Sequence, residues 1–595
     1  MGQLERLLAA LSVLLVFVYV VLRAIYVPTF HDEAATFFHY IVSERYLPYQ
    51  AHWDANNHIL NSALGFLCYK LFGAEQIWIR LPNVLSFLVY GFFAVRITEE
   101  LKSGLLRWLT LIAILTAVFL LEFFSLSRGY AMSIGFLLGA VYHGAQYLKT
   151  TKLKHQLLLW FWMCLAVAAS LTLINSYIIL LGLTFLVILI KVEEERNLHF
   201  LVWSVAFCFF AAAAHYGFQL KERGLLYTGF DEGFIGVTVQ SLVRYQLQIE
   251  SESIAIAVTV IGALASMLIL LKFAMQSLRW SAIRLTAFLL LFNAIGSVLL
   301  NWIFGMNFPE NRVGMYYIPL FLITFSGALD ELSETNKKLK WLGLSLVFFP
   351  VHMLYHFNFN TTILWPKWHA SDDIYNRVVE YQREQGKTLM LSADYLNELG
   401  WAYYNFQNDA ELQLLQRDPV PDTLSDLILA RPADFDFASV LYDTMYVDDA
   451  NGVYLLNRRN SVNWSEPKIL EVNTTEIHGS DEFYELLNDS VSRLPGPNGS
   501  LELNATITVD GGLWDGQLII TSADSTGNGT YTSVPMHWLR SAWNGHKLHL
   551  KRTYHFGESA LTFKVYFWNI YKQELNIKIE SFSFQVPEQK ADSAR

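Results

Sequence analysis

The sequence predicts a polytopic α-helical membrane protein with a C-terminal part outside the membrane. Of its 595 residues, 53% are hydrophobic and only 16% are charged. Nearly all long apolar runs lie before about residue 360. After about residue 465 the apolar residues recur at every second position, which is the period of a strand with one buried face. These observations favour a bundle of membrane helices followed by an α/β unit and a β-sandwich.

About eleven segments are apolar over roughly the 20 residues that a spanning helix needs. They are residues 7–27, 80–98, 105–125, 129–148, 156–173, 175–191, 199–217, 252–273, 283–304, 313–330 and 341–359. Basic residues gather in the loops after the second, fourth, eighth and tenth segments, and loops of this kind stay in the cytoplasm. We therefore expect a multi-pass protein of the cell (inner) membrane with a cytoplasmic N-terminus.

Residues 1–360 form the predicted membrane domain, with extracytoplasmic loops at 28–79 and 218–251. The part of the first loop that begins at Asn57 has a helical pattern but is short for a span, so we expect a helix at the membrane interface up to Phe72. By the same sidedness, everything after residue 360 is predicted to be extracytoplasmic.

Residues 361–462 are predicted to form a small α/β domain. Amphipathic helical patterns and short strand patterns alternate there. We expect a helix near 372–385 and strands at 388–393 and 439–442.

Residues 463–595 are predicted to form a β-sandwich, jelly-roll-like in kind. Apolar residues alternate with polar ones in runs such as Leu501, Leu503, Ala505, Ile507 and Val509. No disulfide is expected in this domain or the preceding one, because all three cysteines lie in apolar segments: Cys68, Cys164 and Cys208.

Composition and spacing argue against two classes of function. The formal net charge of -10 disfavours nucleic acid as a partner. No Cys/His spacing typical of a metal site occurs. Asp32, Glu33 and Asp54 could in principle hold a divalent ion, but a metal is not favoured, and no cofactor is predicted.

The candidate site residues are polar side chains at the outer ends of the predicted spans. They are Asp32 and Glu33 after the first span, Asp54, Asn57 and His58 in the first loop, Arg128 and Tyr130 at the fourth span, Lys221 and Arg223 in the second long loop, and Arg312 before the tenth span. Ionisable groups at membrane depth are costly and are more often functional than decorative. A carboxylate can act as general base on a hydroxyl while cationic side chains hold a departing phosphate.

Five segments carry a resemblance to a known family. They read HDEA, WDANNHILN, IRLPNVLSF, SRGYAMS and ENRVGMYYIPLF. In this order they resemble the pattern of the GT-C fold glycosyltransferases, and most of all the bacterial branch with the lipid A aminoarabinose transferases, protein O-mannosyltransferases and rhizobial lipopolysaccharide glycosyltransferases. The resemblance covers roughly residues 5–360.

The resemblance implies an inverting, integral-membrane hexosyl- or pentosyltransferase with a polyprenyl-phosphate-linked sugar as donor. Asp32 matches the family position that acts as the base or positions it, Glu33 is its neighbour, and Asp54 matches a later acidic residue. Arg128 and Arg312 match positions that are candidates for gripping the lipid phosphate. The family often has His-Pro-Pro where this chain reads Asn56-Asn57-His58. This departure bears on the role of His58 and on which acceptor is recognised. Asp54, Asn57 and His58 are the candidates for contact with the acceptor or donor sugar.

Simpler interpretations stay beside the functional ones. Asp54 and His58 could cap the interfacial helix, Arg128 and Arg312 could pair with headgroup phosphates, and Lys221 and Arg223 could be ordinary interfacial charges.

The predicted partners are the lipid-linked sugar, membrane lipids and a glycan, lipid or protein acceptor of the cell envelope. The alternative function is a transporter or flippase of a lipid-linked glycan. It should show ionisable residues near the midplane of broken helices in matching halves, whereas here they lie at the outer edge.

Overall fold

The computed structural model describes residues 2–588, except for 228, 277–278, 367–368, 409–411, 418–423, 495, 497, 510–512, 540–545 and 557–558. The chain divides into two compact units. The membrane unit comprises Met1–Val27 and Arg45–Leu364, and the C-terminal unit comprises Pro28–Glu44 and Trp365–Arg595. The predicted first outer loop, 28–79, is thus shared between the units, because its first part packs with the C-terminal unit.

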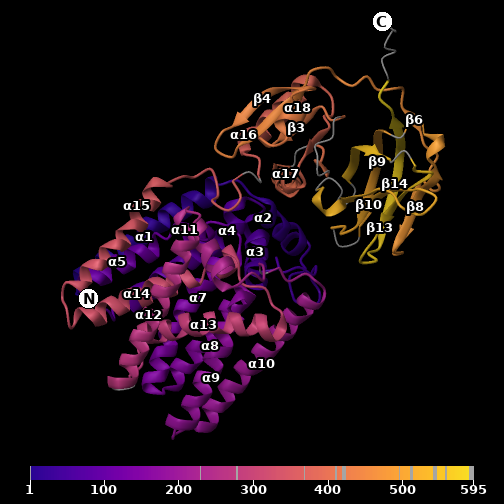
Figure 1. The fold of residues 1–595 in the computed structure, drawn as a ribbon. Helices are drawn as coiled ribbons and strands as arrows, with labels where there is room; N and C mark the ends of the chain where they lie inside the picture. Colours follow the sequence, from indigo (N-terminus) through magenta and orange to yellow (C-terminus); the bar gives the residue numbers. More distant parts are fainter. Residues whose placement is uncertain are drawn as a thin grey trace. The chain divides into compact units, whose positions relative to one another are not determined.

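The membrane unit is helical throughout the part that the structure describes (Figure 1). Its elements are α1 (Gln3–Tyr26), α3 (Ile59–Phe72), α4 (Gln76–Thr98), α5 (Gly104–Leu115), α6 (Val118–Phe124), α7 (Gly129–Thr150), α8 (Leu153–Ala169), η2 (Leu171–Leu173), α9 (Ile174–Lys191), α10 (Arg196–Glu222), η3 (Ile235–Val239), α11 (Gln240–Leu247), α12 (Glu252–Gln276), α13 (Ala282–Phe304), η4 (Asn311–Gly314), α14 (Tyr317–Ser333), η5 (Leu339–Val347) and α15 (Phe348–Tyr355). The predicted helix at the membrane interface corresponds to α3.

Six helices among the described residues are long and apolar enough to cross a membrane. They are α1, α4, α9 with η2, α10, α12 and α13. The pair α5 and α6 would make a seventh span, bent by 54°. The other four predicted spans are the helix α7, whose polar residues lower its hydropathy, and the shorter α8, α14 and η5 with α15. The chain is therefore a multi-pass membrane protein, but the count of about eleven spans is not confirmed.

A buried ion pair fixes the end of the membrane unit. Arg23 of α1 and Glu122 of α6 lie 3.5 Å apart (Nη2 to Oε2), both almost inaccessible to solvent. Arg23 also donates to the carbonyl oxygens of Asn358 and Thr361, at 2.8 and 3.0 Å. Glu122 accepts from the backbone N–H of Ile363 at 2.8 Å. A buried charge is tolerated only when it is paired and hydrogen-bonded, and this pair uses its remaining bonds to hold residues 358–363 in place.

The C-terminal unit combines one continuous helical segment from the first loop with three sheets. Its elements are α2 (His31–Thr36), η1 (Phe37–Val42), α16 (Asp372–Gln385), β1 (Leu391–Ala393), α17 (Tyr395–Asn408), β2 (Gln416–Arg417), β3 (Leu427–Ala430), α18 (Phe435–Ala438), β4 (Tyr442–Asp448), β5 (Val453–Arg458), β6 (Lys468–Ile469), β7 (Glu476–Gly479), β8 (Phe483–Ser490), η6 (Val491–Arg493), β9 (Asn498–Val509), β10 (Gln517–Ala523), β11 (Tyr531–Pro535), η7 (Met536–Trp538), β12 (His546–His555), β13 (Thr562–Trp568) and β14 (Leu575–Gln585). The first sheet has the order β2-β1-β3-β5-β4, with β1 parallel to β2 and β3.

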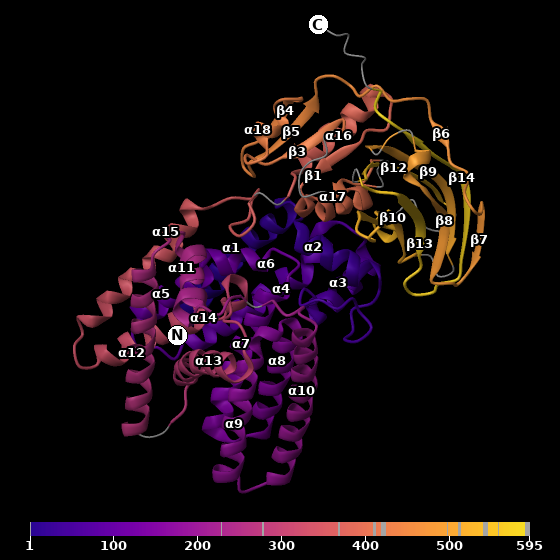
Figure 2. The same ribbon diagram turned by 45° about the vertical axis from the view of Figure 1, so that its right-hand side comes forward.

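The two remaining sheets form the predicted sandwich (Figure 2). One has the order β11-β10-β13-β8, and the other has the order β12-β9-β14-β6 with β7 also paired to β14. The alternating residues of β9, from Leu501 to Val509, are each at most 3% exposed. The β-sandwich and the helix at 372–385 are therefore confirmed.

The strand predicted at 439–442 is wrong. Residues 439–441 form a turn directly after α18, in which the N–H of Ser439 bonds to the carbonyl of Phe435 and that of Leu441 to the carbonyl of Ala438. The strand β4 begins only at Tyr442. Four residues with apolar character carry too little periodicity to separate a strand from a helix end.

Candidate functional site

The sequence motifs of the membrane unit meet at Asn61. This residue of the WDANNHILN segment is fully buried at the start of α3. Its amide nitrogen donates to the carbonyl of Ser127, before α7, at 3.2 Å. Its Oδ1 accepts from Asn83 Nδ2 of the IRLPNVLSF segment at 2.5 Å. Three motifs far apart in the sequence are thus joined by hydrogen bonds between buried amides.

His58, Arg128 and Tyr130 form one cluster beside this junction. The His58 ring meets the Tyr130 ring edge to face, with 4.4 Å between centroids. The Arg128 guanidinium carbon lies 5.6 Å from the centroid of the same Tyr130 ring. Arg128 is the N-cap of α7 and is 1% exposed, and Tyr130 is 7% exposed. The predicted Arg-x-Tyr element therefore places a buried cation next to a histidine.

His58 is held as a neutral imidazole. Its Nδ1 lies 2.9 Å from the carbonyl oxygen of Ala169, and because a carbonyl only accepts, Nδ1 carries the proton. Burial lowers the pKa of His58 well below its usual 6.5, and the charges of Arg128 and Arg312 lower it further. Nε2 is then a hydrogen-bond acceptor, and it has no hydrogen-bond partner among the described residues. Arg312, in η4, thus acts electrostatically on the same side chain as Arg128.

A cavity of about 300 Å³ adjoins the cluster. Three of the predicted residues line it: Asn57, His58 and Tyr130. Seven further polar residues were not predicted: Ser170, Thr172, Asn175, Tyr227, Ser297, Asn307 and Tyr316. The rest of the wall is largely apolar and comes from α9, α10 and α13, with residues such as Ile178, Phe210 and Leu300. The cavity therefore has polar groups on an otherwise apolar surface, as is usual for small-molecule sites.

Two of the unpredicted residues carry a signal in the sequence. Asn175 interrupts an apolar run, and Tyr316 follows Arg312 in the ENRVGMYYIPLF segment. Asn175 lies in the first turn of α9, where its amide nitrogen donates to the carbonyl of Asn293 at 3.0 Å. Tyr227, Ser297 and Asn307 have no local sequence signal.

Five predicted residues of the membrane unit are not among the described residues that line the cavity: Asp54, Arg128, Lys221, Arg223 and Arg312. Asp54 accepts from the N–H of Asn56 at 2.8 Å within its own loop. Lys221 donates to the carbonyl of Phe304, and the Arg223 guanidinium carbon lies 3.9 Å from the centroid of the Trp53 ring. None of the three is among the described residues that line the cavity. Asn57 lines it while donating to the carbonyl of Tyr46 and accepting from Ser62, both at 3.0 Å.

Asp32 and Glu33 belong to the C-terminal unit, in the first turn of α2. Glu33 is 3% exposed and Asp32 is half-buried. The N–H groups of Glu33 and Ala34 bond to the carbonyl of Phe30, and the Thr36 hydroxyl donates to the carbonyl of Asp32. Carboxylates are favoured in the first turn, where the helix presents unpaired N–H groups. Among the described residues, no group of three or more His, Cys, Asp or Glu could hold a metal ion.

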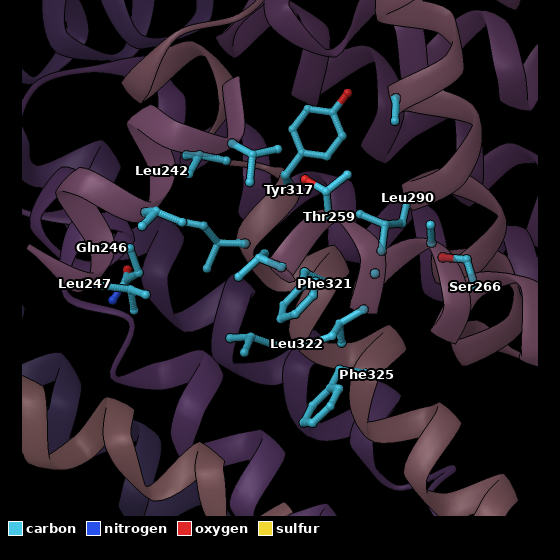
Figure 3. Close-up of a pocket in the computed structure, with 18 of the residues that line it drawn as sticks. Leu242, Gln246, Leu247, Thr259, Ser266, Leu290, Tyr317, Phe321, Leu322 and Phe325 are labelled. Atoms are coloured by element: carbon cyan, nitrogen blue, oxygen red, sulfur yellow. The ribbon is translucent and has the colours of Figure 1, made fainter. Parts of the chain in front are cut away.

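A second cavity in the membrane unit, of about 360 Å³, is almost entirely apolar (Figure 3). Its labelled wall residues include Leu242, Leu290, Phe321 and Phe325. Tyr317 also lines it, and the Tyr317 ring stacks on that of Tyr316 with 4.4 Å between centroids. Because Tyr316 lines the first cavity, two adjacent residues connect the walls of both cavities.

Gly129 has no room for a side chain. A Cβ at this position would lie 1.9 Å from the carbonyl oxygen of Ala169 and 2.8 Å from the Cβ of His58. We expect Gly129→Ala to displace the His58–Ala169 hydrogen bond and to lower stability by about 1–3 kcal/mol. Thermal unfolding in detergent measures the loss. Gly182→Ala is the matched control, because a Cβ there meets nothing within 4 Å in helix α9. Equal melting temperatures for both variants would contradict the packing argument.

The depressed pKa of His58 predicts a pH dependence of stability. Below pH 6.5 the unfolded chain binds a proton at this residue while the folded chain does not, so acidification favours unfolding. The contribution is complete above pH 6.5 and falls below it, by up to about 1.4 kcal/mol per pH unit, until the lower pKa of the folded state is reached. We expect His58→Asn, whose amide can still donate to Ala169, to weaken the dependence of the melting temperature on pH between 7.5 and 5. An unchanged dependence would contradict a neutral His58.

Comparisons with known proteins give distant structural similarities. No protein-family model matches the chain, and no curated protein matches it. It is similar to ArnT from Cupriavidus metallidurans bound to undecaprenyl phosphate, at 12% identity and a TM-score of 0.44, over 77% of this chain and 98% of ArnT. It is also similar to ArnT from the same organism in the apo state, at 11% identity and a TM-score of 0.43, over 76% of this chain and 97% of ArnT. Arabinosyltransferase EmbB from Mycobacterium smegmatis is similar at 10% identity and a TM-score of 0.39, over 97% of this chain and 64% of EmbB.

ArnT and EmbB are GT-C fold glycosyltransferases, the kind that the sequence motifs resemble. Identities near one tenth and TM-scores below 0.5 carry no functional argument. The assignment of an activity therefore rests on the residues of this chain.

Proposed function

We propose that the chain is an integral-membrane glycosyltransferase that moves a hexose or pentose from a polyprenyl-phosphate donor to an extracytoplasmic acceptor. The observation that carries this proposal is the cluster of His58, Arg128 and Tyr130, of which His58 and Tyr130 line the 300 Å³ cavity while Arg128 lies against the Tyr130 ring. A buried guanidinium beside a cavity with both apolar and polar walls suits a phosphate that is attached to an apolar chain.

The phosphate is assigned to Arg128 and Arg312. Both charges act on His58, so a dianionic leaving group bound near that residue would be stabilised by two cations. Arg128 is nearly inaccessible to solvent, where electrostatic interactions are stronger than in water. Tyr130, Lys221 and Arg223 complete the proposed phosphate-binding set from the sequence. The apolar cavity behind Tyr317 offers space for part of the polyprenyl chain.

The sugar is assigned to Asn57 and His58, with Asp54 in their loop. The neutral His58 accepts hydrogen bonds at Nε2, and the amide of Asn57 lines the same cavity. Hydroxyl groups are abundant on a sugar and can donate to such acceptors. Because the His58 ring is neutral, the arginines supply the positive charge that balances the phosphate.

The proposed reaction is a single displacement. Asp32 takes the proton of the acceptor hydroxyl, whose oxygen forms a bond to the anomeric carbon of the sugar. The bond from that carbon to the phosphate oxygen breaks, and its electron pair leaves with polyprenyl phosphate. Configuration at the anomeric carbon is inverted, because attack and departure take place on opposite faces. Glu33, the buried neighbour of Asp32, supports the base.

Transfer and transport are distinguished in sealed vesicles that contain the purified protein. Undecaprenyl-phosphate-linked sugars are supplied together with an envelope lipid, glycan or peptide extract as acceptor. The proposal predicts free undecaprenyl phosphate and a new sugar conjugate. Movement of the intact donor from one leaflet to the other, with no change of covalent partner, would contradict it and favour a flippase.

A further inference from the structure

The segment that carries Asp32 and Glu33 is part of the core of the C-terminal unit. Phe30, Phe37 and Phe38, which flank the two carboxylates, are each 0% exposed. The Phe30 ring stacks on Trp365, with 4.4 Å between centroids. Tyr40 and Ile41, further along η1, are also fully buried. A segment with this many buried aromatic rings is held by packing, not by its own six-residue helix.

We call Phe37, Phe38 and the rings that they contact the anchors of this segment. They belong to two different parts of the C-terminal unit. Phe37 meets Tyr403 and Phe406 of α17 edge to face, with centroids 4.8 and 5.1 Å apart. The ring centroids of Phe38 and Trp538 lie 5.8 Å apart. Trp538 belongs to η7, which follows the sandwich strand β11. The α/β portion and the β-sandwich therefore each hold one side of the same segment.

The backbone of this segment also lies close to α17 at Thr29, just before the two carboxylates in the sequence. A Cβ added at Gly400 would lie 3.0 Å from the carbonyl oxygen of Thr29. Contacts on both sides of Asp32, at Thr29–Phe30 and at Phe37–Phe38, leave the short α2 helix little freedom to move within the unit. Any movement of the C-terminal unit must then carry both carboxylates with it.

We propose that Phe37, Phe38 and Trp538 are positioning residues for Asp32 and Glu33, so that the C-terminal unit sets where the base is placed during transfer. This inference rests on the proposed function for the role of Asp32. It gives the C-terminal domains a part in the chemistry itself, beyond any recognition of an acceptor. A displacement of a catalytic group by about 1 Å can cost about 100-fold in rate, so loss of one anchor should be visible.

The test compares three variants with wild type, using the undecaprenyl-phosphate-linked sugar that wild type turns over best. Trp538→Ala removes an anchor, and we expect kcat to fall at least about 10-fold with the donor KM within about 2-fold. Trp538→Phe keeps a ring against Phe38 and should restore most of kcat. It loses no hydrogen bond, because Trp538 Nε1 has no partner among the described residues. Leu503→Ala opens the core of the sandwich at β9, which belongs to the sheet that does not contain β11, and controls for lost stability.

A second readout does not depend on activity. Hydrogen exchange of the amides in residues 28–44 should be faster in Trp538→Ala and unchanged in Leu503→Ala and Trp538→Phe, under conditions where all variants are folded. The proposal is overturned if Trp538→Ala leaves this exchange unchanged, or if Trp538→Ala and Leu503→Ala lose kcat equally. If wild type transfers no sugar, the proposed function fails, and the exchange data alone still decide whether the segment is anchored in this way.

Discussion

Asp32→Asn is expected to lower sugar transfer by about 10²–10⁴-fold, which is the usual contribution of a general base. An amide is nearly the same size as the carboxylate but cannot take the acceptor's proton. Donor affinity should stay within a few-fold of wild type, since the groups assigned to the phosphate are untouched. Initial rates of release of undecaprenyl phosphate, measured at saturating donor, give the effect on kcat.

Asp231→Asn is the matched control for this prediction. It makes the same chemical change at an exposed carboxylate of the second long loop, outside the proposed site. It should transfer sugar at nearly the wild-type rate. An Asp32→Asn protein with full activity would show that another group accepts the proton, and Glu33 would be the next to test.

The second large effect is expected on donor binding. Arg128→Gln removes a buried guanidinium, and losing one member of a desolvated charge pair typically costs 2–5 kcal/mol, or about 30-fold or more in Kd. Arg128→Lys keeps the charge without the planar fork and should recover only part of the affinity. Titration of each purified variant with undecaprenyl phosphate measures the change.

Lys154→Gln is the control for Arg128→Gln. It removes the same charge from an exposed residue just after the start of α8, in a loop predicted to be cytoplasmic. Its affinity for undecaprenyl phosphate should match that of wild type. If Arg128→Gln also binds as wild type does, the phosphate lies elsewhere, and Arg128 has only a structural role beside Tyr130.

Local patterns in the sequence were enough to predict most of the fold. Long apolar runs located α1, α4, α10, α12 and α13, and the period of two located β9. Both patterns are read over a short stretch of sequence, so they fail where a segment is short or contains both polar and apolar residues without a clear period. The helix α14 has only 17 residues, and the apolar residues just before Tyr442 lie in a turn after α18 instead of in a strand.

The site was predictable in part for the same reason. His58, Arg128 and Tyr130 stand in short motifs, and the structure brings these motifs together through Asn61 and its buried partners. The attachment of α2 to the C-terminal unit depends on rings that are hundreds of residues apart in the chain, such as Phe38 and Trp538. No single-sequence pattern encodes such a contact, so the division of the first outer loop could not be foreseen.

The most direct test of the central claim follows the donor itself. The purified protein in nanodiscs is given a panel of undecaprenyl-phosphate-linked pentoses and hexoses with an envelope acceptor extract, and free undecaprenyl phosphate is quantified by mass spectrometry. We predict its release by wild type from at least one donor, with little or none from Asp32→Asn. Absence of release and of binding for every donor in the panel would contradict the assignment of this chain as a polyprenyl-phosphate-dependent glycosyltransferase.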